Sequence, residues 1–405
     1  MLEKVLEVPV LQPVVAVVVT SANGYGSNFM SFSRLVVPPL IAFLALNVSA
    51  AVLPEDRADV LYHSYDGGGV EVSGPSVLVR KKFGETVSAS INHYVDNVSS
   101  ASIDVLTSAS PYTEERKENS ISLDHLSDKT LMGVSVTKSV ESDFDASTVG
   151  VSFSQEFFGD LTTLNMGYSF GDNTISRNGD SSFSREAKVR NYRLSLSQVV
   201  SKDMIVAFAY EAATDEGYLN NPYRSVRYLN ATGSGFLFQP EVYPGTRTSN
   251  AFAIRTRYYL QRRAVIHGGY RFFSDTWGIE ANTFELGYIF PYKSNWIFES
   301  NLRLYSQSKA DFYNDLFPFQ DAQNFLARDK ELSTFTSVTL GAGANYALDS
   351  SGWSYLKRGS LSLNLDYIQF DYDDFRNIPA GGVAGNEPLY SLSAIVVRAF
   401  ASFWF

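Results

Sequence analysis

Apolar and polar residues alternate along nearly the whole chain after residue 57. Between residues 361 and 367 the odd positions are Leu, Leu, Leu and Tyr, whereas the even positions are Ser, Asn and Asp. The same alternation recurs over residues 162–170, 252–260, 283–290 and 296–305. A period of two is typical of β-strands with two different faces, whereas an amphipathic helix repeats every 3.6 residues. The sequence therefore predicts an all-β protein.

The length and the polar face of these strands separate a membrane barrel from a soluble sandwich. Sandwich strands usually have about 5–6 residues, whereas tilted transmembrane strands need about 9–11, which is the length seen here. Charged side chains on the polar face would need pairing in a dry core, but water hydrates them inside a wide barrel. Nine residues are predicted to line that lumen: Arg255, Arg257, His267, Arg271, Glu285, Glu299, Arg303, Asp366 and Arg398.

Short turns and longer connections alternate along the chain. Short turns fall at 83–85, 127–129, 158–160, 201–203, 261–263 and 292–294, with longer connections at 97–118, 172–186, 215–247, 310–331 and 373–389. Outer-membrane barrels have short periplasmic turns and longer extracellular loops, so the long set is assigned outside. Fifteen alternating segments follow Val77, and a sixteenth at 59–66, with a turn at 67–69, makes the number even. We predict a transmembrane antiparallel up-and-down β-barrel of about 16 strands, with 14 left open because boundaries slip by a few residues.

Both ends of the chain resemble export signals. Residues 30–50 combine basic Arg34, an apolar run and a small-x-small ending, which predicts a signal peptide. Residues 1–29 start with acidic positions unsuited to such a signal, so we expect a start-site artefact, with 51–405 forming a single barrel domain. The last strand resembles the C-terminal signature that the barrel-insertion machinery reads, with Phe403 and Phe405 as the insertion signal.

Composition removes several other classes of protein. The mean hydropathy is slightly negative, too low for a bundle of membrane helices that each need roughly 20 apolar residues. A net charge of -10 argues against nucleic-acid binding, and the absence of Cys removes disulfides and thiolate metal sites. The 24 Tyr and 29 Phe fit the two aromatic girdles of a membrane barrel.

Catalytic chemistry has little support in the sequence. No nucleophile, dinucleotide, phosphate-loop or HExxH motif is present, so we expect no enzyme, no cofactor and no metal. The acidic groups at 371, 373 and 374 and at 311, 315 and 321 lack the spacing of a calcium loop and are interpreted as solvated charge. Opposed charges on the lumen wall either act on permeating solutes or pair along the wall, and both hypotheses stay open.

Several long segments resemble a known family. They are SASINHYVDNVSSASIDVLTSASPYTEER, FFGDLTTLNMGY, DEGYLNNPYRSVRYL, YRFFSDTWGIEANTFELGY, DAQNFLARDKELSTFTSVTLG and IQFDYDDFRN. Over residues 53–405 the chain resembles a bacterial outer-membrane β-barrel family catalogued as a domain of unknown function. The resemblance implies the cell outer membrane of Gram-negative bacteria, with its lipid, lipopolysaccharide and barrel-insertion machinery as partners. It implies no established activity, and it suggests a periplasmic redox partner.

Three functions follow from these observations. The leading hypothesis is a porin-like channel for small hydrophilic solutes. The alternative is a structural or scaffold barrel with a closed lumen that partners an exported or periplasmic redox protein. The third is an outer-membrane enzyme, which lacks a set of catalytic residues. Large barrels leave an aqueous channel unless loops fold in, so the lumen separates the first two hypotheses.

Overall fold

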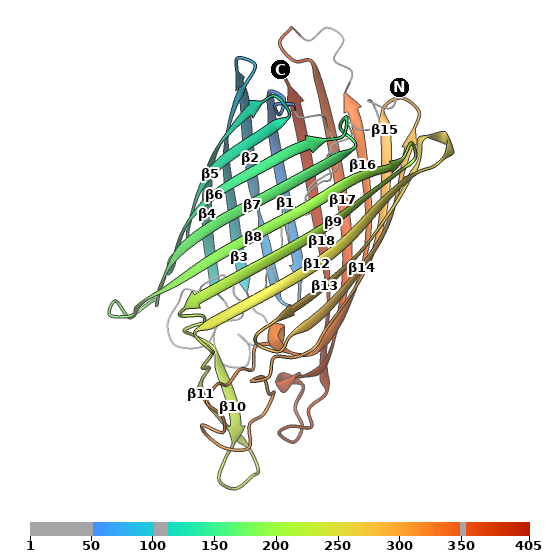
Figure 1. The fold of residues 1–405 in the computed structure, drawn as a ribbon. Helices are drawn as coiled ribbons and strands as arrows, with labels where there is room; N and C mark the ends of the chain where they lie inside the picture. Colours follow the sequence, from blue (N-terminus) through green and yellow to red (C-terminus); the bar gives the residue numbers. More distant parts are fainter. Residues whose placement is uncertain (1–51, 101–111, 349–353) are drawn as a thin grey trace.

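The computed structural model describes residues 52–100, 112–348 and 354–405, and their strands close into one barrel (Figure 1). Within this described part, sixteen antiparallel strands of 11 to 19 residues form the ring, which confirms the predicted number. In chain order they are β1 (Arg57–Gly67), β2 (Val70–Phe83), β3 (Val87–Ser100), β4 (Tyr112–Ser127), β5 (Thr130–Val140), β6 (Phe144–Phe157), β7 (Thr162–Ser176), β8 (Ser184–Ser201), β9 (Met204–Gly217), β12 (Thr246–Tyr259), β13 (Val265–Asp275), β14 (Glu280–Tyr292), β15 (Trp296–Gln307), β16 (Phe335–Leu348), β17 (Arg358–Arg376) and β18 (Leu389–Trp404). The predicted signal peptide and start-site artefact lie outside the described residues.

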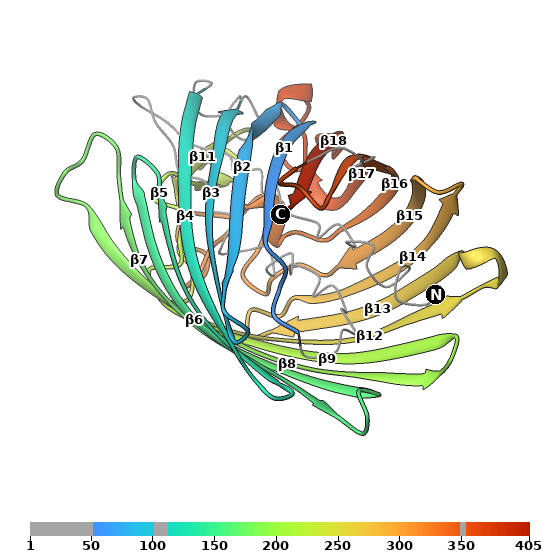
Figure 2. The same ribbon diagram turned by 90° about the horizontal axis from the view of Figure 1, so that it is seen from above.

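The first and last strands close the ring, which Figure 2 shows along the barrel. Strand β1 pairs antiparallel with β18, and Arg57 lies opposite Trp404. Every strand of the ring therefore has two partners, and no edge is left open. Lipid offers no hydrogen bonds to backbone groups, so a closed barrel is the form in which strands can span a bilayer. None of the helices in the described residues is long and apolar enough to cross a membrane.

The outer face of the barrel is apolar. On β5 the side chains of Met132, Val134 and Val136 are 41–52% exposed, while Ser135 between them and Thr137 after them face inward. Near the rim with the short turns, an aromatic group on β14–β16 includes Trp296, whose ring centroid lies 5.7 Å from that of Phe298. An apolar belt with aromatic residues at the rim is typical of outer-membrane barrels. The chain is therefore an outer-membrane β-barrel.

Two predicted boundaries need correction. Strand β2 begins at Val70, well before Val77, because β1 and β2 meet in a two-residue turn at Gly68 and Gly69. Both glycines have positive φ, 60° and 77°, the conformation that tight hairpin turns require. The second correction concerns residues 215–247, which contain the hairpin of β10 (Ser225–Leu229) and β11 (Phe236–Pro240), projecting from the rim opposite the short turns (Figure 1). Five-residue strands give too little alternation to be recognised.

Changing Val136 to Arg is expected to destabilise the barrel by about 2–4 kcal/mol, because a guanidinium would face hydrocarbon near the middle of β5. Thr137→Arg is the matched control, since its side chain enters the lumen from the next position. The measurement is the urea midpoint of refolding into lipid vesicles, followed by Trp fluorescence. Equal losses in the two variants would contradict the assignment of the two faces.

Candidate functional site

The structure places the nine predicted lumen residues on the inward face of the wall. Glu285, for example, lies between Phe284 and Leu286, whose side chains are exposed to the outside. Cross-strand pairs connect several of them. Glu285 Oε1 is 3.5 Å from Arg303 Nε, Glu299 Oε1 is 3.6 Å from His267 Nε2, and Asp366 forms an ion pair with Arg398. Pairing along the wall is thus present for these residues.

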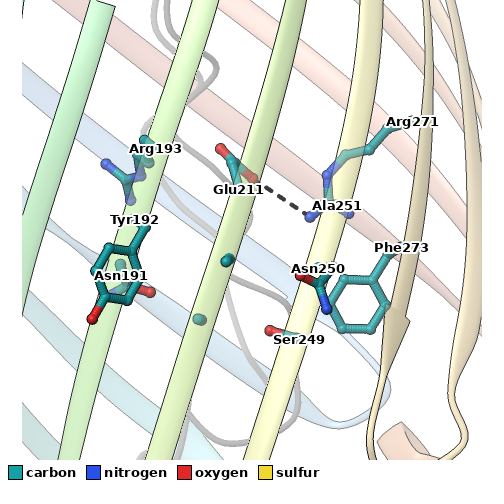
Figure 3. Close-up of a pocket in the computed structure, with 11 residues that line it drawn as sticks. Asn191, Tyr192, Arg193, Glu211, Ser249, Asn250, Ala251, Arg271 and Phe273 are labelled. Carbon is teal, nitrogen blue, oxygen red and sulfur yellow. Dashed lines mark ion pairs between the residues drawn. The ribbon is translucent and has the colours of Figure 1, made fainter.

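A further ion pair spans one intervening strand, and its acidic residue, Glu211, was not among the residues predicted from the sequence (Figure 3). Glu211 on β9 and Arg271 on β13 approach to 3.7 Å between Oε2 and Nη2. Strand β12 runs between them, and the small side chains of Ala251 and Ala253 on its inward face leave room for the contact. Glu211, Ala251 and Arg271, with Arg193 on β8, line a hollow in the wall. We call the following set the charged arc: Arg193, Glu211, Arg255, Arg257, His267, Arg271, Glu285, Glu299, Arg303, Asp366 and Arg398.

Two glycines let the charged arc lie flat against the wall. A Cβ at Gly287 would collide with the imidazole of His267, and a Cβ at Gly341 would collide with the carboxylate of Asp366. Both side chains therefore lie over a neighbouring strand that has no side chain at that point. Folding along the wall keeps them out of the middle of the lumen.

A second arc of the wall has mainly small neutral side chains, with the carboxylate of Asp124, opposite Gly133, beside them. Successive cross-strand partners from β4 to β7 are Ser122, Ser135, Gly150 and Ser169. We call this the small-residue arc, and it comprises Ser120, Ser122, Gly133, Ser135, Thr137, Thr148, Gly150, Ser152, Gly167, Ser169 and Gly171. Strand β5 of this arc and strand β15 of the charged arc lie eight places apart in the ring of sixteen, so the two arcs face each other.

Three connections at the rim opposite the short turns pack together into one unit, which we call the cap. They are residues 218–245, 308–334 and 377–388. Val242 and Leu326 exchange backbone hydrogen bonds of 3.0 and 2.7 Å, which join the first connection to the second. Arg376 at the end of β17 donates from Nη1 to the carbonyl of Glu387 at 2.6 Å.

The cap covers much of this mouth of the barrel. Its apolar side chains, Leu219, Phe312 and Leu332 among them, form one buried cluster with inward-facing residues of β7, β8, β12, β13 and β14. At one side Tyr223 donates to Asp143 in the β5–β6 turn at 2.6 Å. At the other side Arg328 Nη2 donates to the carbonyl of Arg376, the last residue of β17, at 3.2 Å. Those two attachment points lie six to seven places apart in the ring of sixteen strands.

Buried ion pairs hold the cap together. Arg227 is fully buried and forms ion pairs with both Asp315 and Glu387, while Arg328 Nη2 lies 3.0 Å from Asp315 Oδ1. Burial alone would raise the pKa of Glu387, but the hydrogen bond and positive charge of Arg227, together with backbone hydrogen bonds, outweigh burial, so the pKa lies below the ordinary value. The interpretation of Asp315 as solvated charge is wrong, because arginines from two connections enclose it. Asp311 and Asp321 are exposed as expected.

The end of the chain lies at the rim with the short turns. Phe403 is on the outward face of β18, opposite Ala58 of β1. Phe405 donates its backbone N–H to the carbonyl of Asp56 at 3.3 Å, and the ammonium of Lys81 lies 5.2 Å from its ring centroid. Recognition of Phe403 and Phe405 by the barrel-insertion machinery stays a prediction.

Similarity to known proteins is found with one family model and with several solved structures. A family model described as "Protein of unknown function (DUF3570)" matches residues 42–390. No curated protein matches the chain. Among solved structures, a bacterial polysaccharide outer membrane secretin is 8% identical with a TM-score of 0.48, covering 87% of this chain and 99% of its own. OmpT, an outer membrane protein of Vibrio cholerae, is 9% identical (TM-score 0.41; 88% and 100% covered), and the CymD monoaromatic hydrocarbon channel is 10% identical (TM-score 0.41; 87% and 89% covered).

Proposed function

Because this chain belongs to the family described as "Protein of unknown function (DUF3570)", which names no activity, we propose a function from the barrel itself. The proposed function is a channel for small hydrophilic solutes across the outer membrane, narrowed at its outer mouth by the cap. The observation that carries the proposal is the small-residue arc, which faces the charged arc, where His267 and Asp366 lie flat against the wall.

The dimensions of the wall support passage of hydrated solutes. A barrel of sixteen strands leaves an aqueous lumen unless its loops fill it. The cap lies at the outer mouth, whereas the small-residue arc follows the middle of β4–β7. Solutes would therefore meet one narrow entrance followed by a wider polar passage. Size at the entrance is expected to limit what passes.

Solute flux into proteoliposomes tests this function. Swelling rates with a series of neutral sugars should fall steeply as the size of the sugar increases. Liposomes without protein are the control for leakage, and altered migration of unheated samples in gels shows that the barrel is folded. A folded barrel that admits no sugar would contradict the proposal.

The charged arc predicts a preference for anions. Six arginines and four carboxylates make up its permanently charged members, so positive charge exceeds negative by two. The double change Arg255→Gln and Arg257→Gln removes that excess and is expected to move the reversal potential in a salt gradient toward cation preference. Arg262→Gln in the short turn after β12 is the control and should leave the potential unchanged. An unaltered potential in the double variant would place the selective region elsewhere.

The second candidate is a closed structural barrel, and the cap is the observation that favours it. A mouth fully filled by the cap would leave a scaffold, for which the family resemblance suggests a periplasmic redox partner. We propose no enzymatic activity. His63 pairs with Asp96 at 2.7 Å and stacks on Tyr94, but it is fully buried and out of reach of a substrate.

A further inference from the structure

Three carboxylates meet at the outer rim, beside the cap. Glu114 lies near the start of β4, while Glu141 and Asp143 belong to the turn between β5 and β6. One oxygen from each carboxylate lies within 4.8 Å of an oxygen from the other two. The pairing of β4 with β5 explains the meeting, because Lys117 lies opposite Val140 and the next residues of both strands continue side by side to the rim.

Two members of this acidic cluster are buried. Glu141 is 8% exposed and Asp143 is 2% exposed, so water screens their repulsion poorly. Arg116 Nε lies 3.8 Å from Glu141 Oε1, but the same guanidinium also donates to Glu118 and lies 3.8 Å from Asp96. Glu114 Oε1 accepts hydrogen bonds from the backbone N–H and the hydroxyl of Ser142, which lies between Glu141 and Asp143 in the same turn. These contacts hold the carboxylate of Glu114 close to the other two.

The carboxylate of Asp143 provides an independent indication of a ligand. Its Oδ2 accepts a hydrogen bond from the Tyr223 hydroxyl at 2.6 Å, whereas its buried Oδ1 accepts none. Buried polar atoms in native proteins nearly always have a partner, and an ion is one of the few that a carboxylate oxygen can have without a nearby donor. Tyr223 comes from the cap and Asn178 from the β7–β8 connection, so the surrounding elements fix this side chain in place.

We propose that Glu114, Glu141 and Asp143 bind a divalent cation, preferentially Ca²⁺, at the outer rim. Calcium takes six to eight oxygen ligands at about 2.3–2.6 Å, so two ligands of one ion are at most about 5 Å apart. The oxygens of the cluster satisfy that limit. All three ligands are hard carboxylate oxygens, which suit Ca²⁺ rather than Zn²⁺ or copper. The bound ion would join β4 and the β5–β6 turn to Tyr223 of the cap.

Calcium titration of the full-length barrel tests the site. The protein is refolded in detergent without lipopolysaccharide, which itself binds divalent ions, and is freed of metal with a chelator. Isothermal titration with CaCl₂ should give one ion per barrel, with weaker binding of MgCl₂ because Mg²⁺ dehydrates reluctantly. Asp143→Asn and Glu141→Gln should each weaken Ca²⁺ binding by at least tenfold.

Asp128→Asn is the matched control, since Asp128 lies in the short turn at the other end of the same β4–β5 hairpin. Its φ of 52° is one that Asn tolerates, and its Ca²⁺ affinity should equal that of the wild type. Altered migration of unheated samples shows that each variant is folded. No heat of binding in the folded wild type, or equal affinity in the wild type and Asp143→Asn, would overturn the proposal.

Discussion

Replacing Arg227 with Ala is expected to raise the conductance of the reconstituted barrel several-fold. The fully buried guanidinium joins the cap connections through Asp315 and Glu387, and its Nε donates to the carbonyl of Asp315 at 2.9 Å. Removing one partner of a buried ion pair costs about 3–5 kcal/mol, because the remaining charges stay buried without compensation. Here Glu387 would lose its guanidinium partner and Asp315 would keep only Arg328, so the cap should loosen and the outer mouth should widen.

Planar-bilayer recording measures this effect directly. Arg185→Ala is the control, because Arg185 is an exposed arginine near the same rim. Arg227→Lys keeps the charge but loses the planar fork of donors, and its conductance should fall between those of the wild type and Arg227→Ala. Larger and noisier open steps in Arg227→Ala alone support a cap that narrows the mouth. Equal steps in all four proteins would show that the cap does not limit conduction.

The second large effect is expected from filling the small-residue arc. Gly150→Trp places an indole in the lumen beside Ser135 and Ser169, and we expect a loss of roughly half the conductance or more, since a pore is limited by its narrowest part. A Cβ at Gly150 would first meet the Ser135 hydroxyl at 2.8 Å, which can rotate away. The strand should therefore accept the change.

Val149→Trp is the matched control for this prediction. Val149 is the preceding residue on β6, and its side chain is 49% exposed on the outer face, so the indole would enter lipid. Its conductance should equal that of the wild type. If Gly150→Trp conducts normally while folded, the passage does not follow the small-residue arc.

The barrel could be predicted from the sequence because the patterns that specify it lie within short stretches of the chain. Alternation places each side chain on one face, and the order of short and long connections requires the additional strand at residues 59–66, which is β1 in the structure. The inward placement of Arg255, Glu285 and Arg398 follows from the same alternation. The exact ends of strands are predicted less well from local alternation. Strand β2 begins at Val70 and not at Val77, because a two-glycine turn joins it directly to β1.

The cap could not be predicted because its contacts join distant parts of the chain. Arg227 pairs with residues 88 and 160 positions away, and no periodicity in the connections indicates such a meeting. Asp315 was therefore interpreted as solvated, although two arginines enclose it. The acidic cluster was missed for a related reason, because Glu114 meets Asp143 only in one register of β4 against β5. A shift of two residues would separate them.

Single-channel recording of the wild-type barrel is the decisive test of the proposed channel. The protein, refolded and shown to be folded by its gel migration, is added to a planar bilayer in concentrated salt. We expect small, discrete and stable open steps, with a reversal potential that indicates anion preference in a salt gradient. A folded barrel that inserts into the bilayer but stays electrically silent would contradict the channel and favour the closed structural barrel.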